Sequence, residues 1–228
     1  MSQNRREFVE RLGAGALLAA LPVSDVLSAF GRRAPLGESA ELVEEWDLSW
    51  VNRVNGKYRA VFDVPEIDSG YGVWRASLWV QQYSDVLKVN PRDCSPVLVL
   101  RHNGIALAMQ QSFWDKYGVS KWKPVTHPIT QQGTDRNPAL LASSRNEVPA
   151  DFDAVALDKY LSRGGVALAC NLAFDEMIGL VSAKDGTTGD ASRKTALAGL
   201  VPGVIMQPSG VFAALRAQDA GCKYLRAS

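Results

Sequence analysis

The spacing of apolar and polar residues along the chain predicts strands that alternate with helices. Residues 57–64 alternate in polarity and are rich in β-forming side chains, which is typical of a strand. Residues 72–89 place apolar side chains at helical spacing, and residues 96–101 form a short apolar run that predicts a buried strand. Residues 105–117 are rich in Ala, Leu, Met and Gln, so a helix is expected there.

The second half of the chain continues this alternation after a long interruption. Residues 118–150 carry four prolines and no clear periodicity, which predicts a loop-like insert. A helix capped by Asp151 or Asp153 is expected to run through Leu161. The remaining predicted elements are a strand at 166–170, helices at 172–183 and 190–200, a strand at 204–207, a helix at 211–220 and a strand at 223–226.

Residues 164–170 combine a helix-breaking glycine pair, a short apolar run and a cysteine. The Gly164-Gly165 pair breaks a helix, a short apolar run follows, and a new helical pattern starts directly after Cys170. The sequence therefore predicts a strand-to-helix turn with a thiol at its apex. A free cysteine is also among the most frequently buried residues, so a core-filling Cys170 stays an alternative.

The alternating order predicts an α/β fold with a parallel sheet covered by helices on both faces. Right-handed crossovers bring the carboxyl ends of parallel strands to one edge, where ligands bind in such sheets. Cys94 and Cys222 precede their strands and are expected at the opposite edge. The residues expected at the carboxyl edge are Asp63, His102, Asn103, Gly104, Cys170, Asn171, Ser209 and Gly210.

Two of these residues are candidates for catalysis. The free N–H groups at the start of the following helix would favour the thiolate form of Cys170. His102 ends the neighbouring strand unit, and a Cys–His pair would supply a proton shuttle. The alternative for His102 is a polar residue that caps a helix.

Four other residues at this edge are candidates for substrate binding. Asn171 is expected to cap the helix that follows Cys170, and Asn103 lies beside His102 in the sequence. Ser209 and Gly210 begin a helix whose N–H groups would bind an oxyanion or sulfonate. A tight turn that needs glycine is the alternative for Gly210.

Composition and charge exclude several classes of partner. The 228 residues are 46% hydrophobic and 21% charged, with a formal net charge of +1. This balance gives no electrostatic basis for binding nucleic acid or an anionic membrane surface. No Gly-rich nucleotide-binding loop is present, and Cys170, His102 and His127 match no short metal-ligand motif, so neither a cofactor nor a metal is expected.

The N-terminus predicts export. Residues 4–9, with the pair Arg5-Arg6, resemble the twin-arginine export motif, although Asn4 replaces the usual Ser or Thr. The apolar run at 12–22 has the length of a signal h-region and is short for a bilayer span. We expect residues 1–34 to be a signal peptide and linker, residues 35–55 an N-terminal extension, and the protein periplasmic. A retained leader that anchors the chain, or an amphipathic helix, is the alternative.

The number of cysteines bears on the redox state of the thiols. Three cysteines in an exported chain leave at least one thiol that is unpaired or pairs outside the chain. A disulfide from Cys170 to Cys94 or Cys222 would have to cross the sheet, so Cys170 is expected to be free.

Four segments of the last third resemble the DsrE/DsrF-like family of sulfur-relay proteins: residues 164–170, 200–204, 207–211 and 217–224. The resemblance implies a flavodoxin-like domain at residues 56–228, with a parallel sheet of about five strands and helices on both faces. It implies an oligomer and a persulfide carried by the cysteine at Cys170. The insert at 118–150 and the Trp-rich region from Trp46 to Trp79 depart from the family pattern, and no second relay cysteine is evident.

Two functional hypotheses follow. The first is an exported thiol protein that binds or transfers sulfane sulfur on Cys170, with a small sulfur compound or a thiol protein as its partner and a homo-oligomer as its assembly. The second is a non-catalytic periplasmic binding or assembly protein that retains the same fold around an inert Cys170. The solvent exposure of Cys170 and the groups near its sulfur discriminate between them.

Overall fold

The computed structural model describes residues 46–228. The predicted leader at 1–34 and residues 35–45 of the predicted extension lie outside this range. Within it, Trp50 belongs to a short 3-10 turn, η2 (Ser49–Arg53), and its side chain is fully buried against the sheet. The indole Nε1 donates a hydrogen bond to the Gln207 Oε1 atom at 3.1 Å. The last residues of the predicted extension therefore pack on the α/β domain.

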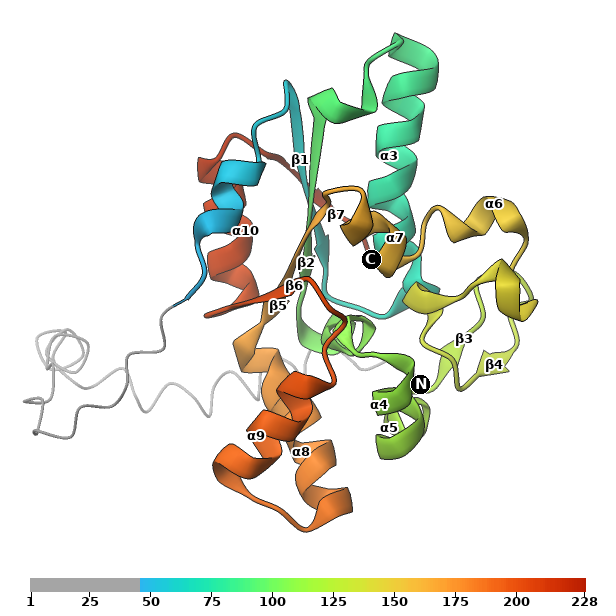
Figure 1. Cartoon of the computed structure of the whole chain (residues 1–228), viewed down its shortest axis with the longest axis vertical. Coiled ribbons are helices and arrows are strands. Elements are labelled where there is room, and N and C mark those ends of the chain that lie inside the picture. The colour runs from blue at the N-terminus through green and yellow to red at the C-terminus, as the bar shows by residue number, and fades with distance from the viewer. Residues whose placement is uncertain (1–45) are drawn as a thin grey trace, which may run out of the picture. The chain divides into compact units, whose positions relative to one another are not determined.

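Five parallel strands form the main sheet in the order β6-β5-β2-β1-β7. The interior strand β5 is buried along its whole length, which is typical of a parallel strand covered on both faces. The fold is therefore the predicted α/β, flavodoxin-like arrangement (Figure 1). The strands are β1 (Tyr58–Val64), β2 (Cys94–Leu100), β5 (Val166–Cys170), β6 (Val204–Gln207) and β7 (Lys223–Arg226).

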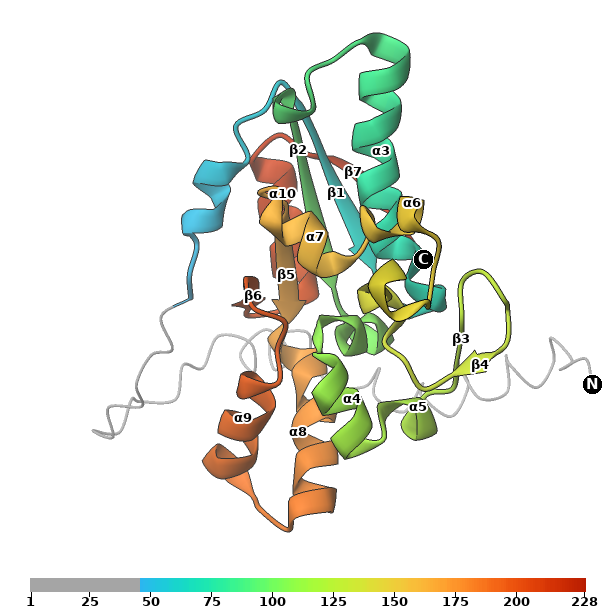
Figure 2. The ribbon, with the colours of Figure 1, turned by 45° about the vertical axis from the view of Figure 1, so that its right-hand side comes forward.

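Helices cover the two faces of the sheet unequally. Only α10 (Gly210–Asp219) and η2 cover one face among the described residues, where they pack on Val61, Val99 and Leu168. The core on the other side includes side chains from all the remaining larger helices, and Figures 1 and 2 show α10 and α3 on opposite sides of the sheet. These helices are α3 (Tyr71–Leu87), α4 (Gln111–Tyr117), α7 (Leu157–Ser162), α8 (Asn171–Asp185) and α9 (Gly189–Ala198).

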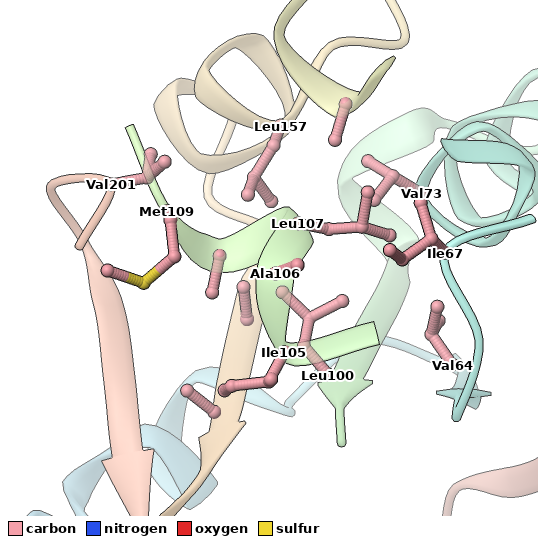
Figure 3. Packing of buried hydrophobic residues seen from close by; sticks show 14 of the residues in the cluster. Val64, Ile67, Val73, Leu100, Ile105, Ala106, Leu107, Met109, Leu157 and Val201 are labelled. Atoms are coloured by element: carbon pink, nitrogen blue, oxygen red, sulfur yellow. The ribbon is translucent and has the colours of Figure 1, made fainter. Parts of the chain in front are cut away.

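The larger core lies on the α3 side of the sheet. Figure 3 shows the side chains of Leu107, Val73 and Ile67 meeting beside the 3-10 segment η5 (His102–Ala108). Residues 105–109 are all fully buried, so this segment passes through the core instead of lying on its surface. A chain buried on all sides has no amphipathic face, so the apolar residues of this segment fit a 3-10 segment as well as the expected helix.

Two predicted helices are interrupted in the structure. The helix expected at 105–117 is the segment η5 followed by α4, because Met109 and Gln110 adopt extended backbone conformations between them. The helix expected to end at Leu161 is split into α6 (Ala150–Asp153) and α7, with Ala156 extended before α7 begins. The other predicted strands and helices form at their expected positions within a few residues.

The insert at 118–150 consists of short elements on the α3 side of the sheet. Asn137 is fully buried and fixes the insert to η5, because its Nδ2 atom donates to the carbonyls of Leu107 and Met109. No helix among the described residues is long and apolar enough to cross a membrane. The elements of the insert are α5 (Val119–Trp122), β3 (Val125–Thr126), β4 (Gly133–Thr134), η6 (Pro138–Leu140) and η7 (Ser143–Arg145).

Candidate functional site

Cys170 is the last residue of β5 and the N-cap of α8. The helix begins directly at Asn171, and the Cys170 Sγ atom accepts a hydrogen bond from the Ala173 N–H at 3.4 Å. This position is at the partially positive end of the helix, which stabilises negative charge on the sulfur. The residue is only 6% exposed. Cys170 therefore combines a geometry suited to a thiolate with limited access from solvent.

The strand order places Cys170 at the point where the connections change face. The helix α8 leaves β5 on the α3 side of the sheet, whereas α10 leaves the neighbouring strand β6 on the other side. Such a reversal opens a crevice between the carboxyl ends of two adjacent strands, and open α/β sheets bind ligands there. Cys170 pairs in register with Gln207, so both residues lie at these strand ends, where such a crevice is expected.

Three of the predicted binding residues lie at the two helix starts. Asn171 is not the helix cap, as Cys170 fills that role, and the Asn171 Oδ1 atom instead accepts from Arg193 Nη2 of α9 at 2.9 Å. Ser209 caps α10 through its Oγ atom, which accepts from the Phe212 N–H at 3.0 Å. Both helices thus begin at the crevice with a satisfied side-chain cap.

Gly210 has a packing reason to be glycine. A Cβ atom at this position would lie 2.5 Å from the Cβ and Cδ atoms of the Arg101 side chain. The first turn of α10 therefore approaches the stem of Arg101 closely, which no larger residue permits without a shift. Gly210 does not have a positive φ, so a left-handed turn is not the reason for glycine here. The close approach to Arg101 is the reason.

The structure places His102 and Asn103 against Glu66, in the loop that follows β1. The His102 Nδ1 atom lies 3.5 Å from Glu66 Oε1, and Asn103 Nδ2 donates to Glu66 Oε2 at 2.7 Å. No hydrogen bond or ion pair among the described residues joins His102 to Cys170. The expected pairing of His102 with the thiol is therefore not formed. The prediction was wrong because a sequence does not show toward which neighbour the chain turns after a strand ends.

Arg101 also lies at this edge, although it is not among the site residues predicted from the sequence. The pairing of β2 with β5 runs to Leu100 and Ala169, so the next residues, Arg101 and Cys170, are neighbours across the two strand ends. Strand alternation directs both side chains to the face that α10 covers. The available signal was a cation at the end of the otherwise apolar strand predicted at 96–101.

Arg101 is held by a nearly buried carboxylate. Its Nε and Nη2 atoms donate to the two oxygens of Asp63 at 2.7 Å and 2.8 Å, and the Tyr224 hydroxyl donates to the Asp63 Oδ2 atom at 2.6 Å. The hydrogen bond and ion pair with Asp63 raise the pKa of Arg101. The hydrogen bond to the same carboxylate also raises the pKa of Tyr224. The guanidinium therefore stays charged in a fixed orientation beside the crevice.

The other two cysteines lie at the opposite edge, as expected, and form no disulfide. Cys94 begins β2, Cys222 directly precedes β7, and all three cysteines are free and buried. Burial raises the pKa of the Cys94 thiol and raises that of Cys222 to about 11. Both thiols are thus protonated at neutral pH, which makes them inert compared with an activated cysteine.

His127 has a structural role inside the insert. Its Nδ1 atom accepts from the N–H groups of Ile129 and Thr130, so the ring proton lies on Nε2, which donates to the Glu147 carbonyl at 2.9 Å. Within residues 46–228, no group of three or more His, Cys, Asp or Glu side chains is arranged to hold a metal ion.

Comparisons with known proteins add little to this geometry. No family model matches the chain, and no curated protein matches it. A search of solved structures finds a protein of unknown function from Methanobacterium thermoautotrophicum, with 15% sequence identity and a TM-score of 0.37. The match covers 74% of this chain and 98% of the other. That protein has no assigned activity, so the resemblance to sulfur-relay proteins stays a prediction.

Proposed function

We propose that the protein is a thiol protein that binds and transfers sulfane sulfur as a persulfide on Cys170. The observation that carries the proposal is the position of the thiol, which caps α8 at the crevice where the sheet connections change face. In the proposed step, the Cys170 thiolate attacks the outer sulfur of thiosulfate. The S–S bond of thiosulfate breaks, sulfite leaves with the bonding electron pair, and a cysteine persulfide anion remains.

The residues around the thiol have matching roles in this proposal. The N–H groups at the start of α8 stabilise the negative sulfur before and after transfer. The guanidinium of Arg101, fixed by Asp63, attracts an anionic sulfur donor to the strand ends. Asn171 and Ser209 keep the two helix starts in place through their hydrogen bonds. His102 has no role in the proposed sulfur transfer, because its side chain lies against Glu66.

The proposal includes a protein partner and export. Leu172 and Val211 lie in the first turns of α8 and α10, and both side chains are mostly exposed next to the crevice. Exposed apolar residues beside a reactive group suit docking of a thiol partner protein or of a second copy of the chain. Export through the twin-arginine leader would place this surface in the periplasm. Replacing the pair Arg5-Arg6 by lysines is expected to retain the protein in the cytoplasm, as measured by cell fractionation.

Mass spectrometry tests the sulfur-carrier function directly. The reduced protein is incubated with thiosulfate or polysulfide, and the Cys170 peptide is expected to gain the mass of one sulfur atom. Cys94→Ser and Cys222→Ser are matched controls, because both thiols are buried at the other edge, and each should leave this label unchanged. The proposal fails if Cys170→Ser is labelled as heavily as the parent protein.

One observation favours a second candidate, a non-catalytic binding or assembly protein. With 6% of its surface exposed, Cys170 is as buried as the two structural cysteines. The rate of alkylation by iodoacetamide at neutral pH separates the two functions. A Cys170 that reacts only when the protein unfolds supports the binding protein, whereas a Cys170 that reacts much faster than Cys94 and Cys222 supports the sulfur carrier.

A further inference from the structure

A groove of about 570 Å³ lies between α3 and the edge strand β7. It follows the first half of β1, from Tyr58 to Phe62, on the face of the sheet that α3 covers. Cys170 lies elsewhere, at the carboxyl end of β5, with β2 and β1 between β5 and β7. The groove has the size of a pocket for a small organic ligand, and the function proposed for Cys170 makes no use of it.

Aromatic rings form a continuous wall of this groove. The ring centroids of Phe62 and Trp79 are 5.8 Å apart, those of Trp79 and Tyr83 are 4.9 Å apart, and those of Tyr83 and Tyr58 are 5.2 Å apart. On the other side of the groove, Leu225 of β7 pairs in register with Phe62 and is 49% exposed. Tilted rings on one wall and an exposed aliphatic side chain on the other suit a flat aromatic body.

The polar residues of the groove are cations and neutral groups. Lys57, Arg59, Arg75 and Lys223 line it, and no Asp or Glu does. Arg75 is compensated by Asp68 at 3.0 Å, whereas the bonded N–H groups of Arg59 are directed at backbone carbonyls. Within the described part of the chain, neither lysine forms an ion pair with a carboxylate. The groove is therefore electropositive and complementary to an anion.

We propose that the groove between α3 and β7 binds an aromatic carboxylate or sulfonate. The ring lies between Trp79 and Leu225, and the anionic group faces the lysines at the amino end of β1 and β7. This site is independent of sulfur transfer, so Cys170→Ser is expected to bind the same ligand with the same affinity. Aromatic contacts and charge attraction then act on different ends of one molecule, which gives orientation as well as affinity.

Calorimetric titration of the full chain with 2-naphthalenesulfonate tests this site. We expect one molecule bound per chain, with an affinity that falls as the NaCl concentration rises, because the lysines are exposed to solvent. The cation 2-naphthylmethylammonium has the same ring and the opposite charge, and it should bind at least about tenfold more weakly. Octanesulfonate has the charge without the ring, and it should also bind more weakly. Equal binding of either compound overturns the proposal.

Two matched pairs of variants locate the binding site. Gln82 lines the groove, and its neighbour Gln81 is exposed on the same helix without lining it. Gln82→Trp is expected to block binding, and Gln81→Trp is expected to leave it unchanged. Likewise, the double substitution Lys57→Gln/Lys223→Gln should weaken binding about tenfold, whereas Lys121→Gln, at an exposed position on α5, should not.

Each variant is first checked for a parent-like circular dichroism spectrum and unfolding midpoint, so that lost binding is not lost folding. Absence of binding to the parent protein overturns the proposal, as do equal affinities within either matched pair. None of these results affects the sulfur-carrier function, because the mass-spectrometric label on Cys170 is measured without the aromatic ligand.

Discussion

Removing either partner of the ion pair between Asp63 and Arg101 should lower the stability of the protein by a different amount. The Asp63 side chain is 2% exposed, whereas the Arg101 side chain is 33% exposed. Removing the charge of Asp63 leaves an arginine that can still reach water. Removing the charge of Arg101 leaves a carboxylate in the interior with only the Tyr224 hydroxyl as a side-chain partner. Arg101→Gln is therefore expected to destabilise the protein more than Asp63→Asn does.

The size of the effect follows from the burial of the group left behind. Leaving a buried charge without its partner costs about 3–5 kcal/mol, which is the loss expected for Arg101→Gln. For Asp63→Asn we expect about 1–2 kcal/mol, because the third-exposed guanidinium is rehydrated and one hydrogen bond to the amide oxygen remains. Glutamine keeps the Cβ, Cγ and Cδ atoms that pack on Gly210, so lost packing contributes little to the first value.

Urea unfolding in a reducing buffer at neutral pH measures both substitutions and the double variant. Asp63→Asn/Arg101→Gln carries no unpaired charge, and it should be more stable than Arg101→Gln alone. The reasoning is refuted if Asp63→Asn costs as much as Arg101→Gln, or if the two losses simply add in the double variant.

Two further predictions concern the amino edge of the sheet and the start of α10. Because burial raises the pKa of Cys222 from 9.0 to about 11, the unfolded chain loses this proton at a lower pH than the folded chain, and the free energy of unfolding should fall between those pH values. Cys222→Ala should remove about 2 kcal/mol of that decline in urea titrations across this range, and an unchanged pH slope would contradict the assignment. Gly210→Ala should lower the free energy of unfolding by about 1–3 kcal/mol, because its Cβ atom would meet the Arg101 stem at 2.5 Å. The control Gly179→Ala, with no atom within 4 Å of the new Cβ in α8, should instead raise it by about 0.5–1 kcal/mol, and equal effects of the two substitutions would disprove the packing argument.

The sequence predicts the fold well where local signals agree. The turn at Gly164-Gly165, the buried run of β5 and the start of α8 are confirmed, because glycine punctuation and apolar length indicate the same boundaries. The α/β class and the carboxyl edge follow from the order of elements alone. Prediction fails at residues 105–109, because the helix is expected from residue content and complete burial leaves no amphipathic pattern that could test it.

The candidate site is less predictable than the fold, because it depends on strand order and register. A sequence places His102 and Arg101 next to each other, and it does not show which of them is directed toward Cys170. The pairing of β2 with β5 makes Arg101 the neighbour of Cys170, while the backbone of His102 adopts a left-handed conformation and its ring lies near Glu66. His102 and Arg101 are adjacent in the sequence, yet only Arg101 continues the strand and faces the same side as Cys170.

The single change of face in this sheet explains why Cys170 is both buried and suitably placed for chemistry. From β1 to β6 the chain moves across the sheet in one direction, and all the intervening larger helices pack on the α3 side. Strand alternation directs Cys170 to the other side, which only η2 among the described elements would cover if the last crossover also ran on the α3 side. Because the chain reverses after β6 to reach β7, α10 covers that side instead. The thiol is therefore buried beside the starts of α8 and α10, so access to its sulfur should depend on the first turn of α10.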